Sequence, residues 1–183
     1  MTKQKEVVIA GFGGQGVMTI GQLLAYTAME EGKQVVWIPS YGPEMRGGTA
    51  NCTVVVSENR IGSPIINSPQ SACVFNRPSL DKFGQLIRPG GLLLINSSLI
   101  DVRSGRDDIT EFLIPANETA IRVGNPKVAN MIMLAAYIAA TDIVTFKGLE
   151  KMLIKKLGHK KDLMEINKRA IEEGKKLVKK VAI

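Results

Sequence analysis

A chain of 183 residues with 45% hydrophobic and 22% charged residues has the composition of a folded globular protein and not of a disordered segment. The net charge of +7 lies wholly in residues 147–183, which hold 12 Lys and Arg against 5 Asp and Glu and no aromatic residue, so we do not expect nucleic acid as a partner. Solvated helix faces or an acidic partner subunit explain this charge, and we expect one domain over residues 1–183 whose basic helical part covers about 145–183.

Neither export nor a membrane is indicated. The longest apolar run, around residues 131–140, is too short to span a bilayer, and the N-terminus shows no signal-peptide core. Cys52 and Cys73 belong to no CxxC pair and to no Cys/His cluster, which indicates two small buried side chains and no metal site. We therefore expect a cytoplasmic protein without a membrane partner.

The first motif joins a strand to a helix. Residues 7–10 form an unbroken apolar run that predicts a strand buried on both faces of a parallel sheet. Gly11, Gly13 and Gly16 follow with G-x-G-x-x-G spacing, and the helical pattern then runs from residue 17 to about 31. A helix start that follows glycines offers free N–H groups and close approach to an anion. A tight turn that binds nothing remains the alternative.

The next strand, residues 34–38, completes a βαβ unit over residues 6–38. A dinucleotide site needs an acidic residue at the end of this strand to hold a ribose hydroxyl. The chain has Ser40 there, and the nearest acid, Glu44, lies in the following loop. This argues against NAD and is only weakly compatible with NADP, whose ribose phosphate Ser40 and Arg46 would hold.

A second unusual loop covers residues 40–49, S-Y-G-P-E-M-R-G-G-T. Its glycines and proline fix the course of the backbone, and we expect it at the carboxyl ends of the strands beside the first glycine loop. Arg46 offers a planar fork for a carboxylate or phosphate. The alternative is a Glu44–Arg46 ion pair that only orders the loop.

The remaining pattern predicts further strands and helices of an α/β fold. Ser79 is the expected N-cap of the helix 80–87, and Asn117 is the expected cap of a short helix that ends at Gly124. Asn76, Asn96 and Ser97 follow strand ends, where bonding within their own turns is favoured over lining a cleft. We expect strands at residues 50–56, 61–66, 72–75, 92–95 and 112–114, an apolar helix from Asn125 and Pro126 to about residue 141, and amphipathic helices at about 146–157 and 162–180.

Groups for independent catalysis are missing from this pattern. The single histidine, His159, lies in a turn among lysines, and neither a nucleophile elbow nor a Walker A motif occurs. Met131 and Met133 are expected to pack in the core. A ligand cleft without such groups suggests that a cofactor carries the reaction or that the chain completes another subunit's site.

The two loops together resemble the gamma subunit of the 2-oxoacid:ferredoxin (acceptor) oxidoreductases, most closely those of the 2-oxoglutarate and 2-oxoisovalerate type. The second loop is the more specific of the two, and the likeness covers about residues 5–140. The resemblance assigns binding roles to two sets of residues, Gly11, Gly13, Gly14, Gln15 and Gly16 in the first loop, and Ser40, Tyr41, Gly42, Pro43, Glu44, Arg46, Gly47 and Gly48 in the second.

The resemblance implies a three-layer Rossmann-like α/β domain with a mostly parallel sheet and C-terminal helices. It implies a complex that oxidatively decarboxylates a 2-oxoacid, with 2-oxoglutarate favoured, to its acyl-CoA and passes electrons to ferredoxin. Thiamine diphosphate, Mg and iron–sulfur clusters would lie on alpha, beta and delta partner subunits. This chain would hold no cofactor tightly, would have no catalytic residue of its own, and would contact either coenzyme A or the alpha subunit through its loops.

Two other interpretations stay open at this point. One is a free-standing NADP-binding oxidoreductase that uses the βαβ unit. The other is a non-enzymatic module that binds a nucleotide or acyl-CoA.

Overall fold

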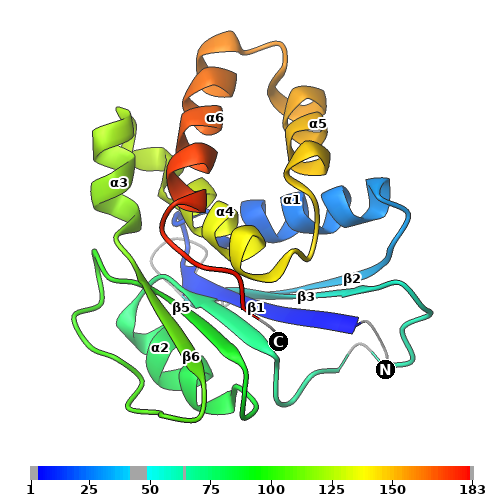
Figure 1. Ribbon diagram of the computed structural model, residues 1–183, viewed down its shortest axis with the longest axis vertical. Coiled ribbons are helices and arrows are strands. Elements are labelled where there is room, and N and C mark those ends of the chain that lie inside the picture. The colour runs from blue at the N-terminus through cyan, green and yellow to red at the C-terminus, as the bar shows by residue number, and fades with distance from the viewer. Residues whose placement is uncertain (1–3, 42–48, 64, 182–183) are drawn as a thin grey trace.

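The computed structural model describes residues 4–41, 49–63 and 65–181. A six-stranded sheet carries a thick layer of helices on one face and a single helix, α2, on the other (Figure 1). The elements in chain order are β1 (Gln4–Phe12), α1 (Val17–Glu30), β2 (Gln34–Tyr41), β3 (Thr49–Ser57), β4 (Ser71–Val74), α2 (Arg77–Phe83), the 3-10 turn η1 (Gly84–Leu86), β5 (Leu92–Asn96), β6 (Thr110–Ile114), α3 (Ala116–Val123), the 3-10 turn η2 (Pro126–Val128), α4 (Ala129–Thr141), α5 (Phe146–Leu157) and α6 (Lys161–Lys175).

The strand order is β2-β3-β1-β4-β5-β6. β1, β4, β5 and β6 are parallel neighbours, whereas β3 is antiparallel to both β1 and β2. The expected mostly parallel sheet is therefore confirmed, and β1, α1 and β2 follow one another as expected. The sequence did not predict that β3 lies between β1 and β2.

Strand β1 is buried on both faces, as its apolar run predicted. Val7 and Ile9 face the thick helical layer, and Val8 and Ala10 face α2. This alternation follows from the two-residue period of a strand, and a layer of helices on each face makes both sets apolar. Because β1 lies between β3 and β4, the loop that follows its carboxyl end starts from the middle of the sheet.

Within the thick layer, α4 is buried on nearly all sides, including Met131 and Met133, which confirms their packing role. Helix α6 packs against α4, whereas α5 packs against α1 (Figure 1). Helix α5 has the expected bounds, while α6 ends at Lys175 and not near residue 180. Their charges are partly matched by ion pairs such as Lys168–Glu150. No helix in the described part of the chain is long and apolar enough to cross a bilayer.

Three local expectations were wrong. Asn76, not Ser79, caps α2, because its Oδ1 accepts a hydrogen bond from Ser79 N at 2.9 Å and proline is tolerated in the first turn. Asn117 lies inside α3, where Ser98 Oγ instead accepts from two first-turn N–H groups. The described residues of 61–66 form no strand, which fits a segment that contains glycine and proline.

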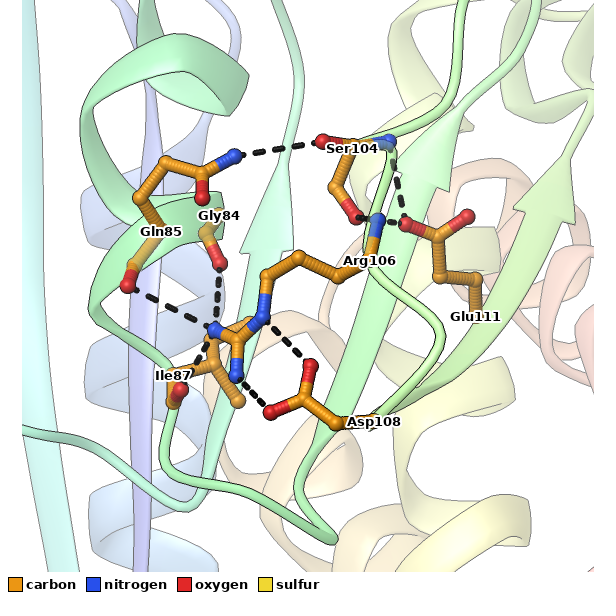
Figure 2. A network of polar contacts seen from close by, with 7 residues as sticks. All are labelled: Gly84, Gln85, Ile87, Ser104, Arg106, Asp108 and Glu111. Carbon is orange, nitrogen blue, oxygen red and sulfur yellow. Dashed lines mark hydrogen bonds and ion pairs between the residues drawn. The ribbon is translucent and has the colours of Figure 1, made fainter.

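The loop before β6 is held by Arg106 (Figure 2). Its guanidinium donates to the backbone carbonyls of Gly84 and Ile87, at 3.2 and 2.6 Å, and forms a forked pair with Asp108. Asp108 lies at the amino ends of β5 and β6, since its carbonyl accepts from Gly90 N. Arg106 therefore joins the loop before β6 to the segment after α2, at the amino ends of the parallel strands.

Candidate functional site

The turn between β1 and α1 lies at the opposite, carboxyl edge of the sheet. Gly14 and Gly16 have φ values of 100° and 76°, which are favourable only for glycine. Gly16 is the N-cap of α1, no side chain caps this helix, and no acid lies in its first turn. The N–H groups and the positive dipole of α1 are therefore not used by a side-chain cap and can attract an anion.

Gln15 closes the crevice beside this turn. The loops after the neighbouring strands β1 and β4 lead to helices on opposite faces of the sheet (Figure 1). The crevice between two such loops is the place where open α/β sheets bind ligands. Here Gln15 Oε1 accepts from Phe12 N at 2.6 Å, and its Nε2 donates to Phe75 O at 3.4 Å. Gln15 thus shapes the loop from inside, and a ligand has to approach from the other side.

Gly11 makes this closure possible. A Cβ at Gly11 would lie 2.6 Å from Gln15 Oε1 and 2.9 Å from the Phe75 Cβ, so only glycine fits between β1 and the folded-back amide. A Cβ at Gly16 would overlap the amide of Asn130 at the start of α4. Gly11 is therefore required for close approach, and Gly16 is required both for close approach and for its left-handed backbone conformation.

A cavity of about 300 Å³ opens on the free side of the loop. Its lining consists of the glycine loop, the first turn of α1 and the start of β3: Phe12, Gly13, Gly14, Gly16, Val17, Met18, Thr19 and Ala50. The sequence indicated the glycines but gave no signal for Thr19 or Ala50, because neither belongs to a motif and only the strand order brings Ala50 to the loop.

The second loop begins and ends next to this cavity. Ser40 is exposed near the end of β2, and the Tyr41 backbone pairs with Ala50 of β3. Phe12, the last residue of β1, pairs with Thr49. Gly42, Pro43, Glu44, Arg46, Gly47 and Gly48 lie outside the described residues. The residues on either side of this segment are thus brought together with the glycine loop, as predicted.

The polar residues after the other strands serve the fold. Asn76 caps α2, and its Nδ2 comes within 3.5 Å of Gln15 Oε1. Asn96 is fully buried and donates to Asn117 Oδ1 at 2.8 Å, while Ser97 N donates to Ile114 O. Among the described residues, Asn96 Oδ1 has no partner. These groups shape the edge of the sheet and do not line the cavity beside the glycine loop.

The cysteines are buried in the core. Burial raises the pKa of the Cys52 thiol to about 11, an effect that the neighbouring Trp37 indole only partly offsets, and raises that of Cys73 further. The Cys52 Sγ donates to Val17 O at 3.7 Å beneath α1. His159 is exposed in the turn between α5 and α6 and does not line the cavity beside the glycine loop. The described part of the site can bind and orient an anion, and it presents no general acid or base beside it.

The chain matches the family model described as pyruvate ferredoxin/flavodoxin oxidoreductase over residues 6–177. It is 37% identical to the ketoisovalerate oxidoreductase subunit VorA of Methanothermobacter marburgensis over 94% of this chain, and it spans 36% of that relative's length. It is 33% identical to the 2-oxoglutarate synthase subunit KorC of Methanocaldococcus jannaschii over 82% of each chain.

A solved structure has the same fold. It is the gamma subunit of a keto/oxoacid ferredoxin oxidoreductase from Geobacter sulfurreducens, which is 28% identical and superposes with a TM-score of 0.81 over 94% of this chain and 96% of that chain. The likeness therefore extends through the C-terminal helices as well as the two motif loops.

Proposed function

The chain belongs to the pyruvate ferredoxin/flavodoxin oxidoreductase family, and from that premise we propose that it is the gamma-type subunit of a 2-oxoacid:ferredoxin oxidoreductase complex. The complex would oxidise and decarboxylate a 2-oxoacid, 2-oxoglutarate or a branched-chain 2-oxoacid, and conserve the product as its acyl-CoA. The two relatives described above carry names for these two acids.

One observation carries the proposal. The glycine loop and Ala50 line a single cavity at an uncapped helix start, and the backbone pairing of Ala50 with Tyr41 brings the other end of the second motif loop next to it. Such a cavity suits the phosphates of coenzyme A because it combines backbone donors, a helix dipole and close approach. Gly13, Gly14 and Gly16 would lie against the ligand, with Gln15 holding the loop from behind.

The chemistry itself would lie elsewhere in the complex. Thiamine diphosphate with Mg, and the iron–sulfur clusters that pass electrons to ferredoxin, would be held by the alpha, beta and delta subunits. Thiamine diphosphate supplies carbanion stabilisation. The present chain would orient coenzyme A and contribute to the subunit interface, and it would not turn over substrate alone. Its cysteines are free and buried, which suits a reducing compartment such as the cytoplasm.

Isolation of the chain with its natural partners tests the proposal. We expect thiamine-enzyme subunits to copurify and the complex to form acyl-CoA from a 2-oxoacid. Recovery of a lone polypeptide that binds NADPH tightly would contradict the proposal and favour a free-standing oxidoreductase.

A matched pair of variants addresses the second loop. Arg46→Ala should weaken assembly or raise the concentration of coenzyme A needed for half-maximal rate. Arg88→Ala is the control, because Arg88 is exposed in the turn before β5 at the opposite edge of the sheet. Equal behaviour of the two variants in both assays would remove Arg46 from the site.

A further inference from the structure

One half of the sheet extends beyond the helix that covers its thinner side. Helix α2 packs against β1 and β4, and β2 and β3 continue past it on the same face (Figure 1). The register assigns side chains to this face, because opposite residues of an antiparallel pair share a face: Thr53 pairs with Val8, which faces α2, and with Ile38. Every second residue along the two strands lies on the same face. We call this set the open sheet face: Val36, Ile38, Ser40, Asn51 and Thr53.

The open sheet face is only partly shielded from water. Ile38 has an exposed fraction of 39%, Ser40 is exposed, and the other three residues are half-buried. Val36 and Ile38 belong to neither of the two apolar cores, whereas Val35 and Trp37, which point to the opposite face, pack against the helical core. The chain alone therefore leaves branched aliphatic side chains in water that a partner surface can bury favourably.

The two strands that form this face also lack charge. β2 and β3, with 8 and 9 residues, contain no Asp, Glu, Lys or Arg. β4 and β5 lack charge too, but they are buried on both faces. β2 is an edge strand, and exposed edges usually carry charges that prevent pairing with other chains. Its only feature of that kind is Pro39, whereas the other edge strand, β6, contains Glu111. Depletion of charge on a part-exposed surface is typical of the core of a protein interface.

From these observations we propose that the open sheet face docks a neighbouring subunit of the complex through an uncharged, aliphatic surface of that subunit. A charge on the partner surface would be buried here without a counter-ion, which is costly. Hydroxyl and amide groups on the partner would instead pair with Ser40, Asn51 and Thr53.

The relatives favour a different polypeptide over a second copy as the occupant. The chain spans 36% of the length of VorA, so that relative holds further residues beyond the matched domain. The match with KorC covers 82% of each chain. The same domain thus occurs within a long polypeptide and in a short one. The part that VorA contains in addition is the natural counterpart of the body that covers the open sheet face.

A subunit on the open sheet face also reaches the border of the glycine-loop cavity. Asn51 directly follows Ala50, which lines that cavity. The subunit contact and the ligand site therefore meet along β3. The inference deepens the proposed function and rests on it for one point, that the partner is a subunit that holds thiamine diphosphate.

Reconstitution of the complex from the separately purified chain and its remaining subunits tests the inference, with the dissociation constant measured by interferometry. Ile38→Lys should weaken association at least tenfold, about 1.4 kcal/mol, because the ammonium group would lose water without gaining an acid. Ile121→Lys is the matched control, since Ile121 is a 65% exposed isoleucine on α3. It should leave association unchanged. The urea midpoint of isolated Ile38→Lys should match that of the wild type, because this side chain is exposed in the chain alone.

A second pair of variants tests the β3 side of the same face. Thr53→Lys places a charge beside Ile38 and should also weaken association at least tenfold. Thr110→Lys is its control, because Thr110 is an exposed threonine in the other edge strand, β6. Wild-type behaviour of Thr110→Lys would show that a new lysine in a strand is not enough to disturb assembly.

The outcomes separate the inference from the proposed function. Wild-type association of both Ile38→Lys and Thr53→Lys, or equal weakening by these variants and their controls, would overturn the inference and leave the proposed function intact. A dimer of the wild-type chain alone that Ile38→Lys dissociates would also overturn it, because the occupant would then be a second copy. Failure of the wild-type chain to bind any thiamine-enzyme subunit would contradict the proposed function together with the inference.

Discussion

The loops at the two ends of the parallel strands, the Arg106 loop at their amino ends and the glycine loop at their carboxyl ends, differ in how they use their polar groups. At the amino edge, the Arg106 loop uses its polar groups internally, since the guanidinium bonds backbone carbonyls and Asp108 (Figure 2). At the carboxyl edge, the glycine loop contributes Gln15 to the interior and leaves the start of α1 without a side-chain cap. The first loop is built to hold two segments together, and the second is built to leave backbone donors for something else.

This difference separates structural polar groups from binding groups. A buried or half-buried polar group that has partners contributes to stability, and its removal leaves those partners unsatisfied. An uncapped helix start contributes little to stability, but it becomes favourable when an anion binds. Substitutions at the Arg106 loop should therefore change stability alone, and substitutions at the glycine loop should change binding.

The largest effect on stability is expected at Arg106. Arg106→Met keeps the length of the side chain but leaves the Gly84 and Ile87 carbonyls without their charged donor. We expect the free energy of unfolding to fall by about 1.5–3 kcal/mol, the range for hydrogen bonds to charged groups. Urea denaturation measures the change. Assembly with partner subunits and the use of coenzyme A should not change. A loss of either one without a loss of stability would show that the Arg106 loop has a binding role, which contradicts its contrast with the glycine loop.

Gly16→Ala should have the next largest effect, and it should act on both stability and binding. The position has a φ of 76°, and an added Cβ would meet Asn130. Strain of this kind costs about 1–2 kcal/mol. We also expect coenzyme A to be used at least tenfold less well by the complex, because the cavity lining is displaced.

Gly32→Ala is the matched control at the other end of α1. Its φ is 79°, and an added Cβ has no neighbour within 4 Å. The variant should lose about 1 kcal/mol of stability through backbone strain alone and keep its affinity for coenzyme A. If both alanine variants lost affinity equally, the effect would come from general destabilisation and not from the glycine loop.

Much of the fold was predictable because local patterns determine it. The apolar run of residues 7–10 predicted the central strand, and the Asn125-Pro126 pair predicted the start of the helix that includes α4. The position of β3 between β1 and β2 was not predictable, because strand order depends on contacts between segments distant in sequence. The same reason hid the contact between Gly16 and Asn130.

The candidate site was predicted in part. Glycine spacing identified the turn, since few other residues adopt its backbone conformation. The inward role of Gln15 had no signal, because a glutamine in a glycine loop can point to a ligand or back to the sheet. The hollow bordered by α1, η2, α4, α5 and α6 also had no signal in the sequence, since its residues come from five separate helical segments and no motif joins them.

Glu31 gives a smaller and pH-dependent effect within the helical layer. Partial burial disfavours its charge, but hydrogen bonds from Thr145 and Lys33 prevail and lower the pKa of the Glu31 carboxyl. Glu31→Gln should cost about 1 kcal/mol at pH 7, a value near that of one hydrogen bond because solvent screens the pair.

The sign of the pH dependence follows from the lowered pKa. The stabilisation by Glu31 is present above the pKa of an unfolded glutamate, about 4.3, and is lost as the pH falls through the lower folded value. Urea midpoints of the wild type and Glu31→Gln should therefore converge below about pH 4. A difference that persisted at pH 3 would show that packing, not charge, accounts for the substitution.

The smallest expected effect concerns Cys52, which lies beneath the carboxyl edge without being part of its binding surface. Because alkylation requires the thiolate, a pKa of about 11 instead of the ordinary 9.0 should slow the reaction of Cys52 with iodoacetamide at pH 8 about 100-fold. Peptide mass spectrometry measures the rate, and urea should restore ordinary reactivity. Fast labelling of the folded chain would mean that the first turn of α1 opens frequently, since Cys52 Sγ contacts Val17 O there. The glycine loop would then be a mobile segment and not a preformed anion site. In that case the two loops would differ in their mobility, and not in whether their backbone donors are free to bind a ligand.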